Sequence, residues 1–230
     1  MNTLILGSGF GLYGYIPPIY IFSKKIYLKK EYKKFYNTRK ELVKFSKKIY
    51  WYSNLKEIIK KIDYVVIAQR PIDQNKNLNF FFKNKNKIKH FFLEKPIGKN
   101  PHISKKIIIN LNKKKIKYSI GFIFEFTKWY NFLKRKIKKK NNDFNIFWSI
   151  KRNTDYKKSW KHNNFQGGGI LRFYGIHFIK IFSDLDFINI KKNIINKYSW
   201  NIEVSRKDNN KINLRLNFNH MNKFLIKHNS

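Results

Sequence analysis

The chain has 230 residues, of which 42% are hydrophobic and 18% aromatic, so it can bury one or two cores and is too apolar to be disordered. It contains no cysteine, which excludes disulfides and thiolate metal sites. Its formal net charge of +38 raises the question of a polyanionic partner such as nucleic acid. The lysines are spread along the whole chain, however, and Ala68 is the only alanine, a composition typical of AT-rich codons.

Targeting and metal signals are not visible in the sequence. No apolar run approaches the length that spans a membrane, and no basic segment precedes the first apolar residues. A cytoplasmic protein without membrane contact is therefore expected. The six histidines show no spacing typical of metal ligands, so no metal site is predicted.

The first predicted element is a short apolar strand, residues 3–6, that stops at a glycine-rich stretch, residues 7–14. A strand, a tight glycine turn and a helix start are typical of a dinucleotide-binding unit, because glycine lets the backbone turn sharply and approach a pyrophosphate. Pro17 and Pro18 are expected to kink the first helix or to end it early.

The glycine motif can be read in two phases. Starting from Gly7 and Gly9, Leu12 stands where the third glycine belongs. Starting from Gly9, Gly11 and Gly14 have the right spacing, but the motif then begins two residues past the strand. We favour the first phase because the first glycine should close the strand. A plain glycine turn is the alternative, and the position directly after the first strand favours the nucleotide site.

Residues 26–28 form the next predicted strand. An NAD-preferring site has an acidic residue near the end of this strand, about 20 residues past the glycine turn, which holds the ribose hydroxyls. Lys29 and Lys30 stand there instead, and Glu31 follows. Two ammonium groups slightly favour a 2′-phosphate and therefore NADP.

The next elements alternate between helix and strand. Ser53 is expected to cap a helix whose inner side consists of Leu55, Ile58, Ile59 and Ile62. The β-branched run 64–68 is typical of a strand covered on both faces, and residues 69–71 close it. A lysine-rich, weakly helical segment follows.

Residues 91–93 form a short apolar strand, interpreted as the central strand of the sheet, that ends in Glu94, Lys95 and Pro96. Ligands of parallel α/β sheets lie just beyond the carboxyl ends of the strands. A lysine at such a strand end, followed by a proline that fixes the backbone, is held more firmly than a surface lysine. A strand closed by ordinary polar residues is the alternative.

Asn100 and Pro101 mark the start of a further helix, whose inner side consists of Ile103, Ile107, Ile108 and Leu111. Alternating strands and helices with short connections predict an α/β fold with a doubly wound parallel sheet, the Rossmann arrangement. We assign residues 1–120 to this dinucleotide-binding domain and residues 121–230 to a second domain for substrate binding and oligomerisation.

The second domain alternates apolar and polar residues with period two over 144–150 and 212–218. Such strands have one buried face, which is typical of an antiparallel sheet. Residues 208–210 form a predicted turn between the last strand and a strand at 202–204. We expect an α+β domain with an open, mostly antiparallel sheet.

A glycine run, residues 167–169, precedes a helix over 170–182 that is apolar almost all round and is expected to be buried. Phe173 and His177 are i, i+4 neighbours on one face of this helix, with Tyr174 beside them. A histidine on a buried face is usually a satisfied core residue. The glycine run allows close approach of a ligand or another backbone, which favours a functional role.

Three landmarks follow one another in order: the N-terminal glycine turn, the Glu94-Lys95-Pro96 sequence at a strand end, and the glycine run 167–169 followed by Gly175-Ile-His177. Together they resemble the glucose–fructose oxidoreductase / inositol dehydrogenase family (Gfo/Idh/MocA), from residue 1 to about residue 185. Its members pair an N-terminal nucleotide domain with an open antiparallel sheet domain. Trp160 lies shortly before the glycine run, where the family often has a tryptophan.

The resemblance implies hydride transfer between NAD(P)(H) and a hydroxyl or keto carbon of a sugar, nucleotide-sugar or cyclitol. Lys95 would hydrogen-bond the reacting oxygen and His177 would act as general acid/base. The implied substrate-binding residues are Lys95, Trp160, Tyr174 and His177. The implied cofactor-binding residues are Gly7, Ser8, Gly9, Phe10, Gly11, Leu12, Lys29, Lys30, Ala68, Gln69, Arg70, Glu94 and Lys95. A homo-oligomer is expected as the assembly.

Several positions depart from the family pattern. Phe173 stands where the family usually has an aspartate one turn before the histidine, so His177 loses a partner that would orient it. Glu125 stands where many members have an arginine after the first strand of the second domain. Residues 69–74 match the family pattern only loosely. The C-terminal part is shorter than usual for the family, so a second-domain sheet with fewer strands is an open alternative.

Three functions therefore stay open. The first is an NAD(P)-dependent oxidoreductase, and the second is a non-catalytic or degenerate member that binds NAD(P) or a sugar. The third is a basic nucleic-acid-binding protein, although the basic segment 134–142 lacks the interleaved aromatic residues of such sites.

Overall fold

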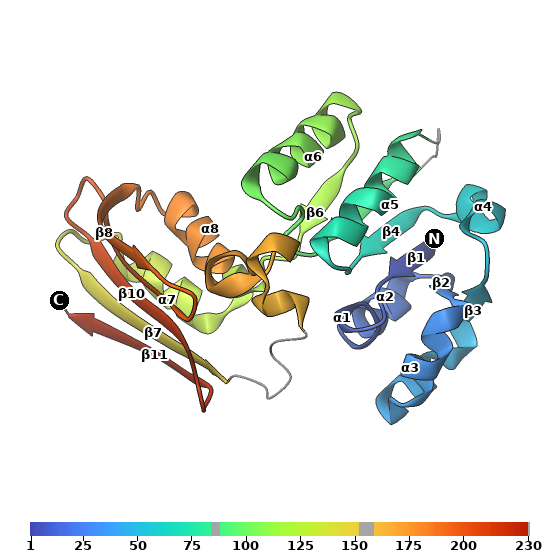
Figure 1. Ribbon diagram of the computed structural model, residues 1–230, viewed down its shortest axis with the longest axis horizontal. Coiled ribbons are helices and arrows are strands. Elements are labelled where there is room, and N and C mark those ends of the chain that lie inside the picture. The colour runs from blue at the N-terminus through green and yellow to red at the C-terminus, as the bar shows by residue number, and fades with distance from the viewer. Residues whose placement is uncertain (84–87, 152–158, 230) are drawn as a thin grey trace. The chain divides into compact units, whose positions relative to one another are not determined.

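The computed structural model describes residues 1–83, 88–151 and 159–229. The chain forms two compact units, Met1–Gly121 and Phe122–Ser230, and each contains its own sheet (Figure 1). Within the described ranges, no helix is both long enough and apolar enough to cross a membrane.

The first unit contains a six-stranded sheet with the strand order β3-β2-β1-β4-β5-β6, and all neighbouring strands run parallel. The strands are β1 (Asn2–Leu6), β2 (Lys25–Lys29), β3 (Ile49–Tyr52), β4 (Tyr64–Ile67), β5 (His90–Leu93) and β6 (Tyr118–Ile120). The doubly wound parallel sheet predicted from the sequence is confirmed. The interpretation of residues 91–93 as the central strand is wrong, because β5 lies one strand from the edge and β1 and β4 form the centre.

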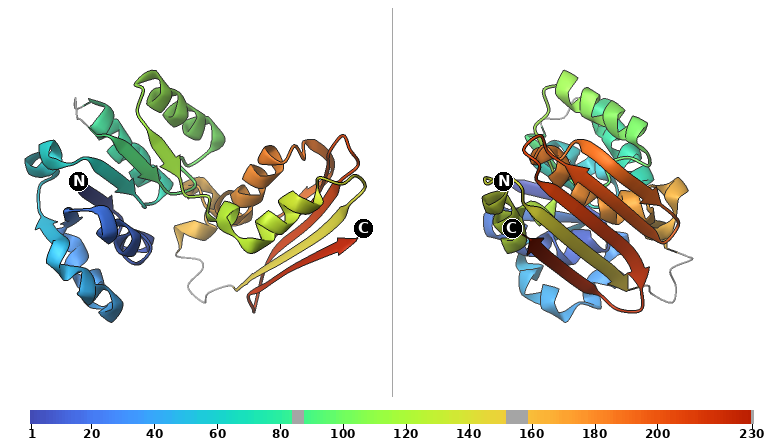
Figure 2. Two further views of the ribbon diagram at one scale, coloured as in Figure 1. Left: turned by 180° about the vertical axis from the view of Figure 1, so that it is seen from behind. Right: turned by 90° about the vertical axis from the view of Figure 1, so that its left-hand side faces the viewer.

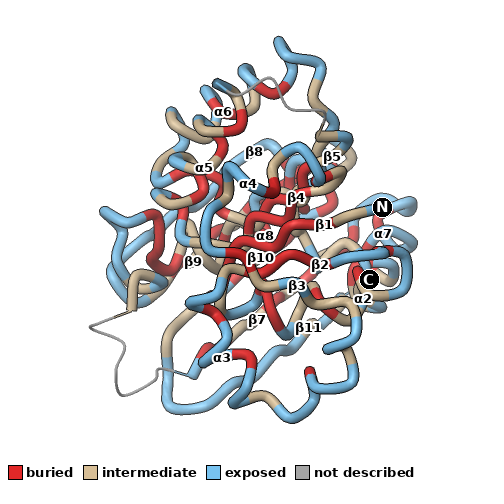
Figure 3. Tube along the Cα trace, turned by 90° about the vertical axis from the view of Figure 1, so that its right-hand side faces the viewer, coloured by how far each residue is buried: buried red, intermediate tan, exposed pale blue. Residues whose placement is uncertain are grey.

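Helices cover both faces of this sheet. One buried cluster joins Leu4, Val65 and Phe91 to α5 and α6, and the opposite cluster joins Ile5 and Val66 to α1 and α2. Burial on both faces explains why the strands are continuously apolar, and Figure 3 shows buried positions along β1 and β4. The helical segments are α1 (Phe10–Tyr13), α2 (Ile16–Phe22), η1 (Lys30–Tyr32), α3 (Lys33–Asn37), η2 (Lys40–Lys48), α4 (Leu55–Ile58), η3 (Ile59–Lys61), α5 (Pro71–Lys83) and α6 (Pro101–Lys113).

The first helix is short, as the prolines after it predicted, but the prolines are not what ends it. α1 stops at Tyr13, and Pro17 and Pro18 lie in the first turn of a second helix, α2. A proline is tolerated there because the first backbone N–H groups of a helix have no partner within that helix.

Asparagines cap the two helices whose starts were predicted. The side chain of Asn100 accepts a hydrogen bond from the backbone N–H of Ile103 at 2.9 Å, as expected for the start of α6. The prediction of Ser53 as the cap of α4 is wrong by one residue, because Asn54 accepts from the backbone N–H of Lys56 at 3.0 Å. α4 is a single turn that continues as the 3₁₀ turn η3.

The second unit contains a five-stranded sheet with the strand order β11-β7-β10-β9-β8. Its strands are β7 (Asp143–Lys151), β8 (Asn189–Ile195), β9 (Ser199–Ser205), β10 (Lys211–Asn219) and β11 (Lys223–Asn229). Three of the four pairings are antiparallel and the β7–β10 pairing is parallel, so the mostly antiparallel sheet is confirmed. The predicted turn at residues 208–210 connects β9 to β10.

Helices α7 (Lys128–Lys136) and α8 (Ile176–Asp184) cover one face of this sheet (Figure 2). Buried side chains of β7, β9 and β10 face them, which explains the period-two pattern of these strands. Short helical turns lie between the longer elements: η4 (Ile123–Phe126), η6 (Trp160–His162), η7 (Asn164–Gln166) and the π-helical η8 (Ile170–Gly175).

β8 and β11 were not predicted, and β10 is therefore not the last strand of the sheet. All seven residues of β8 are exposed, and β11 is exposed at five of seven positions. Because neither strand buries one face fully, neither shows the alternation on which the sequence prediction depended.

The helix predicted over residues 170–182 is two helical segments. A π-helical turn, Ile170–Gly175, leads into α8, and the wider turn changes which residues share a face. Burial is also less complete than predicted, because Ile179 is 44% exposed.

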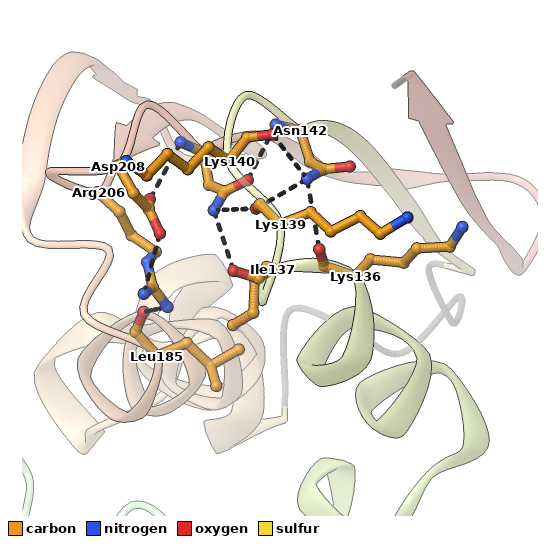
Figure 4. A network of polar contacts seen from close by, with 9 residues as sticks. Lys136, Ile137, Lys139, Lys140, Asn142, Leu185, Arg206 and Asp208 are labelled. Atoms are coloured by element: carbon orange, nitrogen blue, oxygen red, sulfur yellow. Dashed lines mark hydrogen bonds and ion pairs between the residues drawn. The ribbon is translucent and has the colours of Figure 1, made fainter.

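Two buried asparagines hold the end of α7 against the β9–β10 turn (Figure 4). The amide of Asn210 donates to the carbonyl oxygens of Ile137 and Lys139, and its own Oδ1 accepts from the backbone N–H of Asn142 at 2.9 Å. The amide of Asn142 donates to the carbonyl oxygens of Lys136, Lys139 and Lys140. The backbone of the basic segment 134–142 therefore serves to join α7 to the sheet.

Candidate functional site

The turn after β1 requires glycine at its first position. Gly7 has φ +141°, and a side chain there would collide with the backbone oxygen of Ala68, which follows β4. The N–H of Ala68 donates to the carbonyl oxygen of Leu6 at 2.7 Å, so the ends of β1 and β4 lie against one another. This close approach supports the phase of the motif that begins at Gly7. It also lies where the strand order reverses, the usual ligand position in open parallel sheets.

The rest of the turn separates into exposed and buried positions. A side chain added at Gly9 would meet no atom within 4 Å, so the space above this backbone is open. Phe10 is 38% exposed, and Ser8 is half-buried. Gly11 is buried, and Leu12 is fully buried in the core, where its N–H donates to the carbonyl oxygen of Gly9 at 2.9 Å. The side chain of Leu12 thus anchors the turn in the hydrophobic core.

Tyr32 connects three parts of this region and was not predicted from the sequence. Its phenol accepts hydrogen bonds from the backbone N–H of Gly7 and from Nε2 of Gln69, the latter at 3.5 Å. Burial raises the pKa of Tyr32, and the neighbouring Glu31 carboxylate adds to this effect. Tyr32 ends the short 3₁₀ turn η1 and belongs to no motif, so no sequence signal could have identified it.

Two of the charged residues predicted near the cofactor form ion pairs with neighbouring carboxylates. Lys29 forms an ion pair with Glu31 at 2.8 Å, and Arg70 forms one with Asp73 at 2.7 Å. Lys30 is exposed. The positive charge that favoured NADP is therefore partly neutralised by a carboxylate on the same loop.

The turn that carries Lys95 is held by a buried glutamine. Nε2 of Gln74, on α5, donates to the carbonyl oxygens of Glu94 at 2.7 Å and of Pro96 at 3.2 Å, one on each side of the lysine. The Lys95–Pro96 peptide bond is cis. Lys95 itself is half-buried. Its backbone is thus fixed from α5, although Gln74 lies in no recognisable motif.

Glu94 points back toward the segment after the glycine turn. Its Oε1 accepts a hydrogen bond from the phenol of Tyr15 at 2.7 Å, and a side chain on Gly121 would lie 2.5 Å from the same oxygen. Burial raises the pKa of Glu94, whereas the Tyr15 phenol and the Lys95 ammonium act in the opposite direction. This hydrogen bond joins the β1 turn to the β5 turn across β4.

Glu94→Gln should remove one pH-dependent part of the stability. Because the folded-state pKa of Glu94 is raised, its ionisation disfavours the folded chain as the pH rises from the ordinary carboxyl range through the folded-state pKa. The stability of the variant relative to wild type should therefore increase as the pH rises above the ordinary carboxyl range, and the increase should end once Glu94 is ionised in the folded chain. Urea unfolding followed by circular dichroism measures this difference. The exposed Glu57→Gln is the matched control, and an equal trend in both variants would contradict the assignment to Glu94.

His177 lies in the second unit, on α8, and is only 4% exposed. Its imidazole stacks on the ring of Phe124, with centroids 4.2 Å apart and an angle of 15° between the planes. Phe122 meets it edge-on at 6.1 Å. The sequence prediction did not include Phe122 or Phe124, because the 3₁₀ turn η4 and the residue before it carry no motif.

Tyr174, Trp160 and Phe173 form a second aromatic group in this unit. The ring of Phe173 meets Trp160 at 5.3 Å and Tyr174 at 4.8 Å, both edge-on. Burial raises the pKa of Tyr174 to about 12. The predicted substrate residues Trp160 and Tyr174 are thus joined through Phe173, whereas Lys95 belongs to the first unit.

Glu125 forms an ion pair with Lys180. It follows β6, which belongs to the first sheet, so the prediction that it follows the first strand of the second domain is wrong. Its Oε1 lies 3.1 Å from Nζ of Lys180, which also pairs with Asp184 on the same helix. In the part of the chain that the structure describes, no three His, Asp or Glu side chains are grouped as metal ligands.

Comparisons with known proteins agree with this architecture. Solved structures similar to this chain include the dehydrogenase MviM from Clostridium difficile, with a TM-score of 0.74 and 14% identity over 100% of this chain and 74% of that one. The WlbA (WbpB) dehydrogenase from Thermus thermophilus, in complex with NAD and UDP-GlcNAcA, gives a TM-score of 0.68 and 14% identity over 96% of this chain and 74% of that one. A 3-ketoreductase from Actinomadura kijaniata, in complex with NADP and TDP-benzene, gives a TM-score of 0.73 and 10% identity over 96% of this chain and 71% of that one.

At these identities the similarity to solved structures shows the fold. No curated protein matches the chain by sequence. The sequence profile of the Gfo/Idh/MocA family, described as an oxidoreductase family with an NAD-binding Rossmann fold, matches residues 1–122. The chain therefore belongs to the Gfo/Idh/MocA family of NAD-binding oxidoreductases.

Proposed function

We propose that the protein is an NAD(P)-dependent oxidoreductase that acts on a hydroxyl or keto carbon of a sugar, nucleotide-sugar or cyclitol. The observation that carries this proposal is the turn after β5, where Gln74 fixes the backbone on both sides of Lys95. This turn lies at the same carboxyl edge of the parallel sheet as the open glycine turn. Similar structures were solved with UDP-GlcNAcA or TDP-benzene, or are described as myo-inositol dehydrogenases, which supports this substrate class.

The first unit has the features that a dinucleotide requires. The Gly7 turn lies at the reversal of strand order, and the space above Gly9 is open, so a pyrophosphate can approach the backbone closely. We assign cofactor contact to the exposed part of this turn, to Lys29 and Lys30, and to the β4 and β5 ends at residues 68–70 and 94–95. The dinucleotide-binding role of residues 1–120 and the substrate-binding role of residues 121–230 are part of the proposal.

When bound, the nicotinamide supplies the hydride acceptor or donor. In the direction of alcohol oxidation, the Lys95 ammonium donates a hydrogen bond to the reacting oxygen and stabilises the negative charge that develops there. His177 takes the hydroxyl proton, and it returns a proton to the oxygen in the reverse direction. Trp160 and Tyr174 contribute apolar contact surface and a phenol for the sugar.

We further propose a cytoplasmic homo-oligomer. Among the described residues of the second unit, no helix lies on the face of its sheet opposite α7 and α8, and the edge strand β8 is exposed along its whole length (Figure 2). An open sheet face and an exposed edge are suited to contact with a second copy.

A titration of the full chain with NADPH and with NADH tests the proposed cofactor site. Both cofactors should bind saturably at physiological salt, measured by energy transfer from tryptophan, and NADPH should bind somewhat more tightly. ADP-ribose should compete, because it carries the pyrophosphate without the nicotinamide. Absence of binding to all three, in a folded sample, would contradict the proposal. Reduction of NAD(P)⁺ with a panel of nucleotide-sugars and inositols then identifies the substrate.

A degenerate member that binds the cofactor without turnover is the second candidate. It is favoured by Phe173, whose ring packs on Trp160 and lies 5.4 Å from the Lys161 ammonium, where the family usually has an aspartate. This candidate predicts cofactor binding and no hydride transfer with any member of the panel. A single robust activity that depends on Lys95 would dismiss it.

A further inference from the structure

The imidazole of His177 is held as one layer of an aromatic stack. It lies nearly parallel to the ring of Phe124, at 4.2 Å between centroids, and the edge of Phe122 closes a second side. A separation of this size is contact distance for stacked rings. The imidazole and the ring of Phe124 are therefore in face-to-face contact.

Phe124 is itself immobilised by its surroundings. Its ring contacts Trp148 at 5.2 Å, Trp129 at 5.5 Å and Phe178 at 5.8 Å between centroids. Its carbonyl oxygen accepts hydrogen bonds from the hydroxyl of Thr127 at 2.6 Å and from the N–H of the same residue at 3.1 Å. A ring packed on several sides, on a backbone fixed by two hydrogen bonds, cannot turn without displacing its neighbours.

We propose that Phe124 is a positioning residue that orients His177 by stacking. This inference rests on the proposed role of His177 as general acid/base. Sites that use a catalytic histidine commonly orient it through a hydrogen-bonded carboxylate. The residue one turn earlier is Phe173 here, and its ring belongs to the Trp160 group. The stack fixes the tilt of the imidazole and adds no formal charge.

Nuclear magnetic resonance of the full chain with labelled histidine tests the stack without any substrate. In the wild type, the ring-current field of Phe124 should move the His177 ring signals upfield, and the His177→Gln variant assigns them. Phe124→Leu should abolish this shift and increase the mobility of the imidazole. His228, which stacks on Phe144 with centroids 4.9 Å apart, should keep its shift and serves as the internal control.

Phe178→Leu is the matched packing control. Phe178 is fully buried in the same aromatic cluster, and the variant removes the same group of atoms. Because Trp129 and Trp148 still contact Phe124, the Phe124–His177 stack should stay in place. With an identified substrate, Phe124→Leu should lower kcat by about tenfold or more at nearly unchanged KM for the cofactor, since misplaced acid/base groups cost this much. Phe178→Leu should change kcat much less.

Two results would overturn the proposal. The first is an upfield shift that is missing in the wild type or survives in Phe124→Leu. The second is a loss of kcat that is the same in both leucine variants, which would mean that Phe124 matters only for packing. If the wild type transfers no hydride at all, the proposed function fails, and the ring signals alone still decide whether Phe124 orients His177.

Discussion

Lys95→Met is expected to abolish turnover while cofactor affinity stays within a few-fold of the wild type. Methionine keeps most of the apolar stem of lysine and removes the ammonium that would stabilise negative charge on the reacting oxygen. Loss of one such donor typically lowers kcat by about 10²–10³-fold. The backbone of the turn should persist, because Gln74 holds it through main-chain oxygens of the two neighbouring residues. Steady-state rates of NAD(P)H formation and a fluorescence titration measure the two quantities.

Lys99→Met is the matched control for this variant. Lys99 lies four residues further along the same loop and is exposed, so its loss removes the same charge without touching the turn. Its turnover should equal that of the wild type. Unchanged turnover in Lys95→Met would mean that Lys95 has no role in the mechanism. An equal loss of turnover in Lys95→Met and Lys99→Met would mean that the change in net charge of this basic chain causes the loss.

Gly9→Asp is expected to prevent dinucleotide binding in a chain that still folds. A side chain at this position meets no atom within 4 Å, so the fold can accommodate it. The new carboxylate would stand in the open space assigned to the pyrophosphate. Two unit charges about 4 Å apart near a protein surface repel by up to about 4 kcal/mol, which corresponds to a loss of affinity of about 10²–10³-fold. Titration with NADPH measures it.

Two alanine variants separate the effect of the added carboxylate from the effect of the added side-chain volume. Gly9→Ala adds a methyl group to the same open position, so its affinity should fall much less than that of Gly9→Asp. Gly7→Ala should instead destabilise the fold, because its side chain would collide with the backbone of Ala68 and φ is +141°. Wild-type affinity in Gly9→Asp would mean that the nucleotide does not bind at this turn.

Local signals made much of the first unit predictable. The glycine turn, the β-branched run that forms β4, and the Asn100 cap with Pro101 each follow from interactions within a few residues. The position of β5 in the sheet was misjudged, because strand order depends on which strands pair and not on how apolar each one is. The contacts of Tyr15 and Gln74 were missed because they also depend on the fold. The partner of Tyr15 is 79 residues away in sequence, and the partners of Gln74 are 20 and 22 residues away.

The second unit was less predictable for a different reason. Period-two alternation identifies a strand with one buried face but does not tell the direction of its neighbour, so the parallel β7–β10 pairing could not be foreseen. β8 and β11 lack the alternation because they bury little. Phe124 lies in a 3₁₀ turn among other aromatic residues, and only its contacts in the fold distinguish it from them.

The place of β11 beside β7 has a consequence for the order of events during synthesis. Phe224, on β11, completes the aromatic cluster by contacting Trp129 at 5.2 Å and Trp148 at 6.3 Å. About 76 residues separate Trp148 from Phe224, which a ribosome adds in roughly 4–15 s. The first unit, contiguous in sequence, can fold within that interval, while the apolar residues of α7 and β7 wait for their last partner. Nascent chains of this protein are therefore expected to expose apolar surface of the second unit after the first unit has already formed.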